Sequence, residues 1–436
     1  MILLVSNYEK LVSVLIFTVS VALIVSGRFE RHVVFPISAL VLILLGVVPL
    51  TKCYEFIDFD VIGLIIGVSI ISSFIIKSGL AELIAYKVLE LSRGSPVKVL
   101  ILLSLTSGML SIALENVSVV LLLAPITYRV TSLLGVNPVP YMISIAISSN
   151  VSGAATLIGD PPSAMIASAL NLAFMDFIFM HNRPSMFFFT IIPMIISILS
   201  LIRICKPFLK WEDHVGKDVM EILTRPSVDK LFVTEVIAFL TLKIILLSFR
   251  HELHMPLSIP ALLSAFGLVL VRIRHKRDVI DALRESLDYR LILFLIGVFI
   301  LSGSLVETGF INDVAKIVTS ISRSNELLTV NILIWFSVLA SAFLDNIPYF
   351  AATIPLVLNI AEPSGFSKYL LSWALLIGGT LGGNITYIGA MANVTAVRLL
   401  EKWGYNVNFL DFVKIGLPFT LISVILGEAL LLIFWM

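Results

Sequence analysis

The sequence is poor in charge, in cysteine and in histidine. Charged residues make up 14% of the 436 positions, against about 25% in a typical soluble domain, whereas hydrophobic residues make up 58%. The mean hydropathy is +1.05. So few charges cannot cover the surface of a water-soluble chain of this length, which excludes a cytosolic enzyme.

Other features that the sequence lacks exclude further functional classes. The two cysteines, Cys53 and Cys205, lie far apart and form neither a disulfide framework nor a metal-ligand spacing. The formal net charge of +1 gives no broad positive field to hold nucleic acid. No phosphate-binding Gly-rich loop with its lysine accompanies the apolar segments, which excludes an ATP-driven pump. We expect an all-α, multi-pass protein of the cell membrane whose chemistry lies within the bilayer.

An internal repeat runs through the chain. Ile66-Gly67-Val68 recurs 230 residues later as Ile296-Gly297-Val298. The same ungapped register aligns Leu114-Glu115-Asn116 with Leu344-Asp345-Asn346, and Thr156-Leu157-Ile158-Gly159 with Thr386-Tyr387-Ile388-Gly389. A string of identities in one register indicates a duplicated architecture.

The basic residues predict that the two repeats have opposite orientations. Lys and Arg concentrate on the cytoplasmic side of short loops. Residues 203–230 and 272–290 carry six each, so both stretches are placed in the cytoplasm. In this tracing residues 60–77 run from outside to inside, whereas their repeat mate, 290–307, runs from inside to outside.

Two segments in each repeat are predicted not to cross the membrane as simple helices. A spanning helix needs about 20 apolar residues, but the return stretch 117–128 has only 12 before Arg129 and reaches about 18 Å. A helical hairpin that turns near the midplane explains this length and its polar tip, Glu115-Asn116. The alternative is a hairpin that crosses fully and leaves these residues in a surface loop.

Each hairpin precedes a helix interrupted by Gly and Pro, over residues 150–162 and 382–389. Non-helical backbone at membrane depth is tolerated where it lines protein or a water-filled cavity. We therefore expect the two tips and the two breaks to meet at one central site. The stretches 80–94 and 310–324 are amphipathic and are expected to lie along the two membrane interfaces.

The predicted organisation follows from these segments. It comprises a first membrane helix (1–30), a first repeat (31–205) with hairpin 97–134 and broken helix 141–175, a cytoplasmic linker (206–230), and a second repeat (231–436) with hairpin 327–360, broken helix 369–399 and last helix 408–434.

The predicted site contains three acids, Glu115, Asp160 and Asp345, and an acid within the membrane marks a functional site because its burial is costly. Amides, hydroxyls and glycines complete the set of predicted ion- or substrate-binding residues: Asn116, Ser118, Asn150, Gly153, Thr156, Gly159, Asn346, Gly383, Asn384, Thr386, Gly389 and Asn393. The oxygens of Glu115, Asn116, Asp345 and Asn346 suit Na⁺.

Each residue type also has a plainer explanation. Asn can cap a hairpin arm, Gly can allow close helix packing, and Thr can satisfy its own broken backbone. Lys243 and Glu428 interrupt apolar spans without a repeat mate, which favours snorkelling or a local pair over transport chemistry.

Four blocks resemble the signature blocks of the ion transporter superfamily: 114–125, 149–162, 344–348 and 381–393. Thr156-Leu157-Ile158-Gly159-Asp160-Pro161-Pro162 is the most specific of them. The chain is most similar to the branch of arsenite permeases, NhaD-type sodium/proton antiporters and the melanosomal P protein, often labelled citrate-transporter-like. The resemblance begins near residue 31 and implies a homodimer with a static scaffold, in which a hairpin-bearing domain slides as an elevator.

The tips depart from this branch. Glu115 stands where Asp is usual, and Pro348 and Tyr349 stand where Thr-rich sequence is common. The relative that carries dicarboxylates with sodium has Ser-Asn-Thr tips without acids, so no substrate is transferred from the family.

These observations predict a secondary-active transporter of inorganic ions or small oxyacids, coupled to protons or sodium, with no other cofactor. Because no basic residue is expected to face the three acids, a multivalent anion would be repelled. Arsenite-type efflux or sodium/proton antiport is therefore favoured over sodium-coupled di- or tricarboxylate transport. A channel also contains broken helices, but paired inverted hairpins suit occlusion better. An intramembrane hydrolase would need a nucleophile with a base or a metal cluster, and all six histidines fall in loops or at membrane ends.

Overall fold

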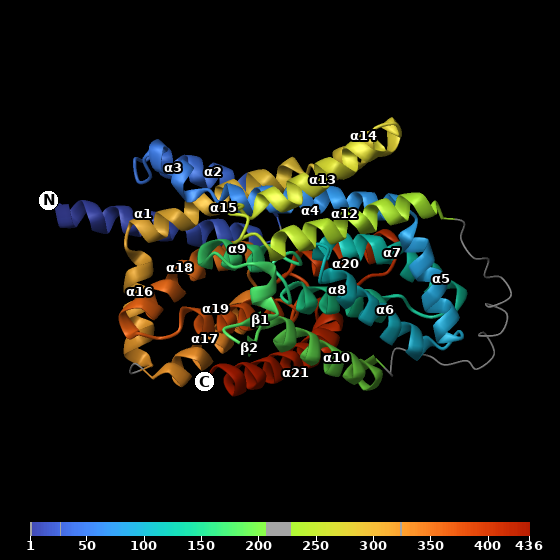
Figure 1. Cartoon of the computed structure of the whole chain (residues 1–436). Coiled ribbons are helices and arrows are strands. Elements are labelled where there is room, and N and C mark those ends of the chain that lie inside the picture. The colour runs from blue at the N-terminus through green and yellow to red at the C-terminus, as the bar shows by residue number, and fades with distance from the viewer. Residues whose placement is uncertain (1, 27, 206–227, 323–324) are drawn as a thin grey trace.

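The computed structural model describes residues 2–26, 28–205, 228–322 and 325–436, so the predicted linker lies almost wholly outside the described residues. Eight helices, which we call the scaffold layer, lie together along one side (Figure 1). They are α1 (Ile2–Val25), α2 (Arg31–Leu44), α3 (Leu50–Phe56), α4 (Phe59–Lys77), α12 (Lys230–Ser248), α13 (Ser258–Arg272), α14 (Lys276–Ser286) and α15 (Tyr289–Glu307).

The hairpins and broken helices form the rest of the molecule, which we call the hairpin layer. From the first repeat it contains α6 (Pro96–Ser111), α7 (Asn116–Leu133), α8 (Val139–Gly153), α9 (Pro161–Leu170) and α10 (Met186–Cys205). From the second repeat it contains α17 (Glu326–Ser341), α18 (Asn346–Ser364), α19 (Lys368–Leu376), the π-helical turn η3 (Ile377–Leu381), α20 (Met391–Lys402) and α21 (Phe409–Trp435).

Two amphipathic helices connect the layers. α5 (Leu80–Ser92) and α16 (Phe310–Ile321) stand across the long helices at opposite ends of the molecule (Figure 1). On α16, Asp313 pairs with Lys10 of α1 at 2.6 Å, and this hydrogen bond lowers the pKa of the carboxyl group. Both predicted interfacial stretches are therefore helices.

Six helical stretches of the described chain are long and apolar enough to cross a bilayer, judged by length and composition. One of them is α7, which shows that the predicted 12-residue return arm was wrong. α7 continues through the exposed Arg129 for 18 residues, or about 27 Å. The helix tolerates the charge because Arg is a good helix former and its side chain points away from the core.

The two repeats use matching elements. α4 and α15 each have 19 residues, and α6 and α17 each have 16. In the scaffold layer α4 packs against α13 and α15 against α2, so each repeat packs on the other. Glycines allow this approach, because a Cβ at Gly67 would lie 2.6 Å from the Ala261 carbonyl carbon, and one at Gly297 would lie 2.6 Å from that of Phe35.

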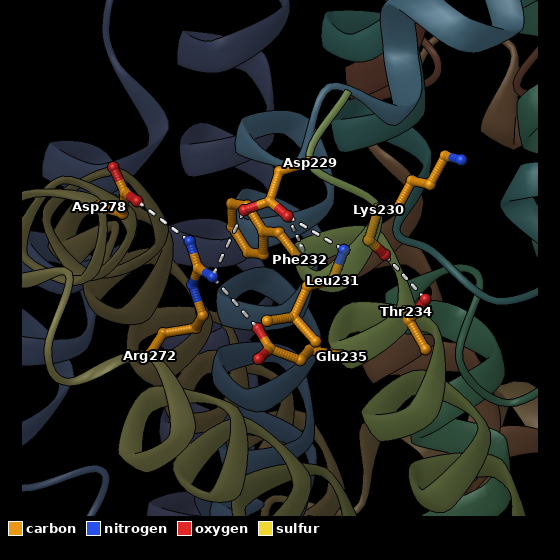
Figure 2. A network of polar contacts seen from close by, with 8 residues as sticks. All are labelled: Asp229, Lys230, Leu231, Phe232, Thr234, Glu235, Arg272 and Asp278. Atoms are coloured by element: carbon orange, nitrogen blue, oxygen red, sulfur yellow. Dashed lines mark hydrogen bonds and ion pairs between the residues drawn. The ribbon is translucent and has the colours of Figure 1, made fainter. Parts of the chain in front are cut away.

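Arg272, at the end of α13, is the centre of a buried polar network in the scaffold layer. Its side chain is only 5% exposed and lies 3.3 Å from Glu235, 3.5 Å from Asp278 and 3.9 Å from Asp229 (Figure 2). Its guanidinium also stacks 3.9 Å from the centre of the Phe232 ring. The network fixes the start of α12 against α13 and α14.

A small β-ribbon departs from the predicted all-α fold. After η1 (Phe174–Phe177), strands β1 (Phe179–Met180) and β2 (Arg183–Pro184) pair antiparallel. The turn between them holds His181 and Asn182 at φ of 51° and 61°, the positive values that a two-residue hairpin requires. The pair is too short to have left a periodic signal in the sequence.

Candidate functional site

Both hairpin tips carry an acid that caps the returning helix. Glu115 precedes α7 and accepts hydrogen bonds from the backbone N and the hydroxyl of Ser118, at 3.0 and 3.1 Å. Asp345 precedes α18 and accepts from the backbone N of Ile347 at 3.1 Å. The N-cap is thus the acid, and Asn116 and Asn346 stand one residue later, so the capping explanation for these asparagines is wrong.

Both helix breaks overlap the predicted stretches, although α8 continues through Gly153 and α9 already begins at Pro161, inside the predicted 150–162. The first separates α8 from α9 over residues 154–160, and the second separates η3 from α20 over residues 382–390. Asp160 caps α9, since its Oδ1 accepts from the backbone N of Ser163 at 3.0 Å. Ala390 occupies the equivalent position before α20.

The tips and breaks are joined by the same contacts in each repeat. The Thr156 hydroxyl donates to Ile112 O of the first tip at 2.6 Å, and the Thr386 hydroxyl donates to Ala342 O of the second. Each hydroxyl also accepts from the backbone two residues later, at 3.3 and 3.2 Å. The hydroxyl of each threonine therefore links the backbone of the hairpin tip to the backbone of the helix break in the same repeat.

The glycines of the breaks serve close approach. None of them has a positive φ. A Cβ at Gly159 would collide with Ser111 O and Gly153 O, and one at Gly389 would collide with Ser341 O and lie 2.6 Å from Gly383 O. The break of each repeat is thereby pressed against its own hairpin tip.

Four asparagines connect the repeats. Nδ2 of Asn150 donates to Oδ1 of Asn384 at 2.8 Å and to Oδ1 of Asn393 at 3.0 Å. Nδ2 of Asn116 donates in turn to Oδ1 of Asn150 at 3.2 Å. The hydroxyl of Ser149 donates to Oδ1 of Asn116 at 3.4 Å. The four amides thus form one hydrogen-bonded chain from the first hairpin tip to the second helix break.

A cavity of about 40 Å³ lies where these elements meet. Its walls are the N-terminal ends of four helices, with Ile65 of α4 and Leu291 of α15 from the scaffold layer. Of the predicted residues, Glu115, Asn116, Asn150, Asp160, Asp345 and Asn346 line it. The remaining predicted residues, namely Ser118, Gly153, Thr156, Gly159, Gly383, Asn384, Thr386, Gly389 and Asn393, are not among the residues that line it.

Asp160 is the most deeply buried acid of the cavity, at 4% exposure. Its Oδ2 has no hydrogen-bond partner in the described part of the chain. A buried carboxylate oxygen in this position is costly unless it holds a proton or faces a cation. Across the described residues no three His, Cys, Asp or Glu side chains form a metal-binding group, so amide oxygens would have to complete a cation site.

The expectation that all three acids lack a basic partner was wrong for Asp345. Nη1 of Arg31, at the start of α2, lies 2.7 Å from its Oδ2. The guanidinium also lies 4.8 Å from the centre of the Phe294 ring. Sequence analysis missed Arg31 because the two residues are 314 positions apart.

The snorkelling explanation for Lys243 was also wrong. Its side chain is fully buried, and Nζ donates to Ala113 O in the first hairpin tip at 3.1 Å. Snorkelling would have placed the ammonium at the membrane surface. Glu428 behaves as expected of a local pair, because it accepts from Nε1 of Trp335 at 3.1 Å.

Comparison with known families gives an independent view of the chain. The profile described as "Citrate transporter" (CitMHS) matches residues 21–378. A 46 kDa membrane protein of Mycobacterium leprae is 31% identical over 96% of this chain and 97% of its own. An uncharacterized transporter of Mycobacterium tuberculosis is 32% identical over 96% and 97%. The human P protein is 28% identical over 88% of this chain, which spans 54% of that longer protein.

Solved structures share the fold at low identity. The YdaH transporter of Alcanivorax borkumensis superposes with a TM-score of 0.57 at 12% identity, covering 87% of this chain and 86% of the other. MtrF of Neisseria gonorrhoeae, described as one of a class of antimetabolite efflux pumps, gives 0.51 at 16% identity over 91% and 84%.

Proposed function

The chain belongs to the CitMHS citrate transporter family, and we propose that it is a secondary-active transporter that moves an inorganic ion or a small oxyacid together with protons or Na⁺. The family and fold agree with the predicted membership of the ion transporter superfamily. The observation that carries the proposal is the cavity between two acid-capped hairpin tips and two helix breaks. Such a site, closed by hairpins, suits occlusion of a solute.

Cation coupling is supported by an unsatisfied acceptor oxygen. Oδ2 of Asp160 has no partner among the described residues, and Asn116 and Asn150 line the same cavity. A proton on Asp160, or Na⁺ bound to its Oδ2 and to neighbouring amide oxygens, would satisfy this group. The proposal places the coupling cation on this side of the cavity.

The charge balance alters the expected substrate. Three carboxylates are offset by Arg31, by Lys243 at the first tip and by four helix N-termini, each worth about half a positive charge. The site is therefore less negative than the sequence indicated, and it can accept a singly charged anion. Arsenite-type transport and sodium/proton antiport remain the leading forms, although charge repulsion weighs less against carboxylates.

Sodium-coupled or proton-coupled transport of citrate-like acids is the second candidate. The family description and the Arg31–Asp345 pair favour it. A trivalent anion would still need more positive charge than the site offers, either as additional cations or as a complexed cation that enters with it.

Movement of the hairpin layer against the scaffold layer is the proposed mechanism of alternating access. It is supported by the fact that both tips and both breaks belong to one layer, whereas the scaffold helices of the two repeats pack on one another. α5 and α16, at opposite ends of the long helices, would connect the layers at the two membrane surfaces (Figure 1). A homodimer assembled through the scaffold is part of the same proposal.

Uptake by purified protein in proteoliposomes tests the function. With imposed Na⁺ or pH gradients, we expect saturable, concentrative movement of arsenite, citrate or Na⁺ itself, and loss of the gradient dependence in Asp160→Asn. Glu428→Gln is the matched control, because Glu428 is also an acid of an apolar helix but is bonded to Trp335 outside the cavity. Non-saturable flux that only runs down its gradient would indicate a channel instead.

A further inference from the structure

The two helix breaks that face the cavity have opposite chemistry. Resting on the proposed function, we propose that the N-terminus of α20 binds an anionic or carbonyl oxygen of the substrate, while the N-terminus of α9 faces the coupling cation. The repeats would then be equivalent in fold but not in the species they bind.

The α9 break presents acceptors. Its first two helical residues, Pro161 and Pro162, have no backbone N–H to offer. The next backbone N–H, on Ser163, is already taken by Oδ1 of Asp160. The other oxygen of Asp160 is buried and has no partner in the described chain. A ligand reaching this end of the cavity therefore has to be a cation or a hydrogen-bond donor.

The α20 break presents donors. The N-cap residue Ala390 has no side-chain oxygen, and Met391 and Ala392 take the places of the two prolines. Their backbone N–H groups have no partner in the hydrogen bonds of the described residues. Ala392 is 1% exposed, and all three residues line the cavity. An acceptor oxygen is the group that would satisfy these donors and the positive end of the helix dipole.

The duplication indicates where that oxygen would lie. Ala390 is 230 residues after Asp160, so the missing carboxylate of the second repeat marks a position that a ligand oxygen can occupy. The other three helix N-termini of the cavity are capped by Glu115, Asp160 and Asp345. Arg31 is engaged with Asp345, whereas the α20 amides are donors at the cavity that no acidic N-cap takes up.

This arrangement defines a class of ligand. The solute needs an oxygen that accepts from the α20 amides, and it either travels with a cation beside Asp160 or carries a hydroxyl that donates to it. Small oxyacids and hydroxy-carboxylates satisfy both conditions. A bare cation could bind beside Asp160, but it has no oxygen that accepts from the α20 amides.

Prolines at the first two positions of α20, as in α9, test the proposal. Met391→Pro/Ala392→Pro removes both N–H groups, and α9 shows that this fold accepts Pro-Pro at the equivalent positions. We expect protection against thermal unfolding by sodium arsenite or sodium citrate to require roughly tenfold or more ligand. Glu428→Gln, which lies outside the cavity, should retain wild-type affinity. Elution on gel filtration and the ligand-free unfolding midpoint check that each variant is folded.

A second variant gives α20 an acidic N-cap residue instead. Ala390→Asp should cap α20 as Asp160 caps α9, exclude the oxyanion, and strengthen the dependence on Na⁺ or pH. If the wild-type protein is protected and the proline variant is protected equally, the oxyanion site is wrong while the transport function stands. If neither ligand protects the wild-type protein, the proposed substrate class is wrong and this inference is wrong with it.

Discussion

The guanidinium of Arg31 lies 2.7 Å from the carboxylate of Asp345, joining the start of α2 in the scaffold layer to the second hairpin tip. The two side chains are 26% and 15% exposed, so the pair borders the solvent-reachable edge of the site. The contact gives the acid of the second tip a basic partner. The acid of the first tip, Glu115, has no ion-pair partner in the described chain.

Breaking this pair should lower stability and change selectivity. Arg31→Gln leaves the Asp345 carboxylate unpaired, and because both groups are partly exposed we expect a loss of about 1–2 kcal/mol. The unfolding midpoint in detergent should fall by a few degrees. Arg31→Gln/Asp345→Asn should regain most of that stability but lose transport, because the tip acid is gone. A wild-type midpoint for Arg31→Gln would mean that the pair contributes nothing to the fold.

Glu115→Gln should abolish coupled transport with little effect on abundance. The carboxylate lines the cavity, whereas its capping bond to Ser118 can be made by the glutamine oxygen as well. Initial rates in proteoliposomes and the yield of monodisperse protein are the two measurements. Glu428→Gln, treated identically, should keep its rate. Wild-type rates for Glu115→Gln would move the site away from the first tip.

The orientation of the repeats can be tested with one pair of equivalent positions. Ser132 at the end of α7 and Glu362 near the end of α18 are both exposed and lie 230 residues apart. In a Cys53/Cys205-free background, we expect a cysteine at 132 to react with an impermeant maleimide from the cytoplasm and one at 362 from outside. Labelling from one common side would contradict the inverted arrangement.

Cross-linking the first tip to the scaffold should stop transport reversibly. Nζ of Lys243 lies 3.1 Å from Ala113 O across the boundary between the layers. Cysteines at 243 and 113, joined by a bifunctional methanethiosulfonate, should halt transport, and dithiothreitol should restore it, because the hairpin layer could no longer slide. The two single-cysteine variants with the same reagent are the controls. A cross-linked protein that transports at the uncross-linked rate would exclude a sliding movement at this boundary.

The pattern of apolar residues and helix breakers, together with the internal repeat, predicted much of the architecture. The breaks were found because Gly and Pro interrupt apolar runs, and the tips because Glu115-Asn116 and Asp345-Asn346 recur in one register. The same register assigns Ala390 as the mate of Asp160, although that difference gained meaning only when both residues were found to line one cavity. The length of α7 was missed, since a single Arg129 was read as the end of a span that in fact continues past it.

The sequence by itself determined that this is a duplicated membrane protein with two hairpins, two broken helices and three acids near their ends, because hydropathy, helix breakers and repeat identities are properties of neighbouring residues. Only the tertiary structure decided which acids are paired and which oxygens are free. Arg31 reaches Asp345 and Lys243 reaches Ala113 across separations of 314 and 130 residues. Such contacts depend on which helices pack side by side and on where each side chain points, and apolar helices of similar length carry little local signal of either.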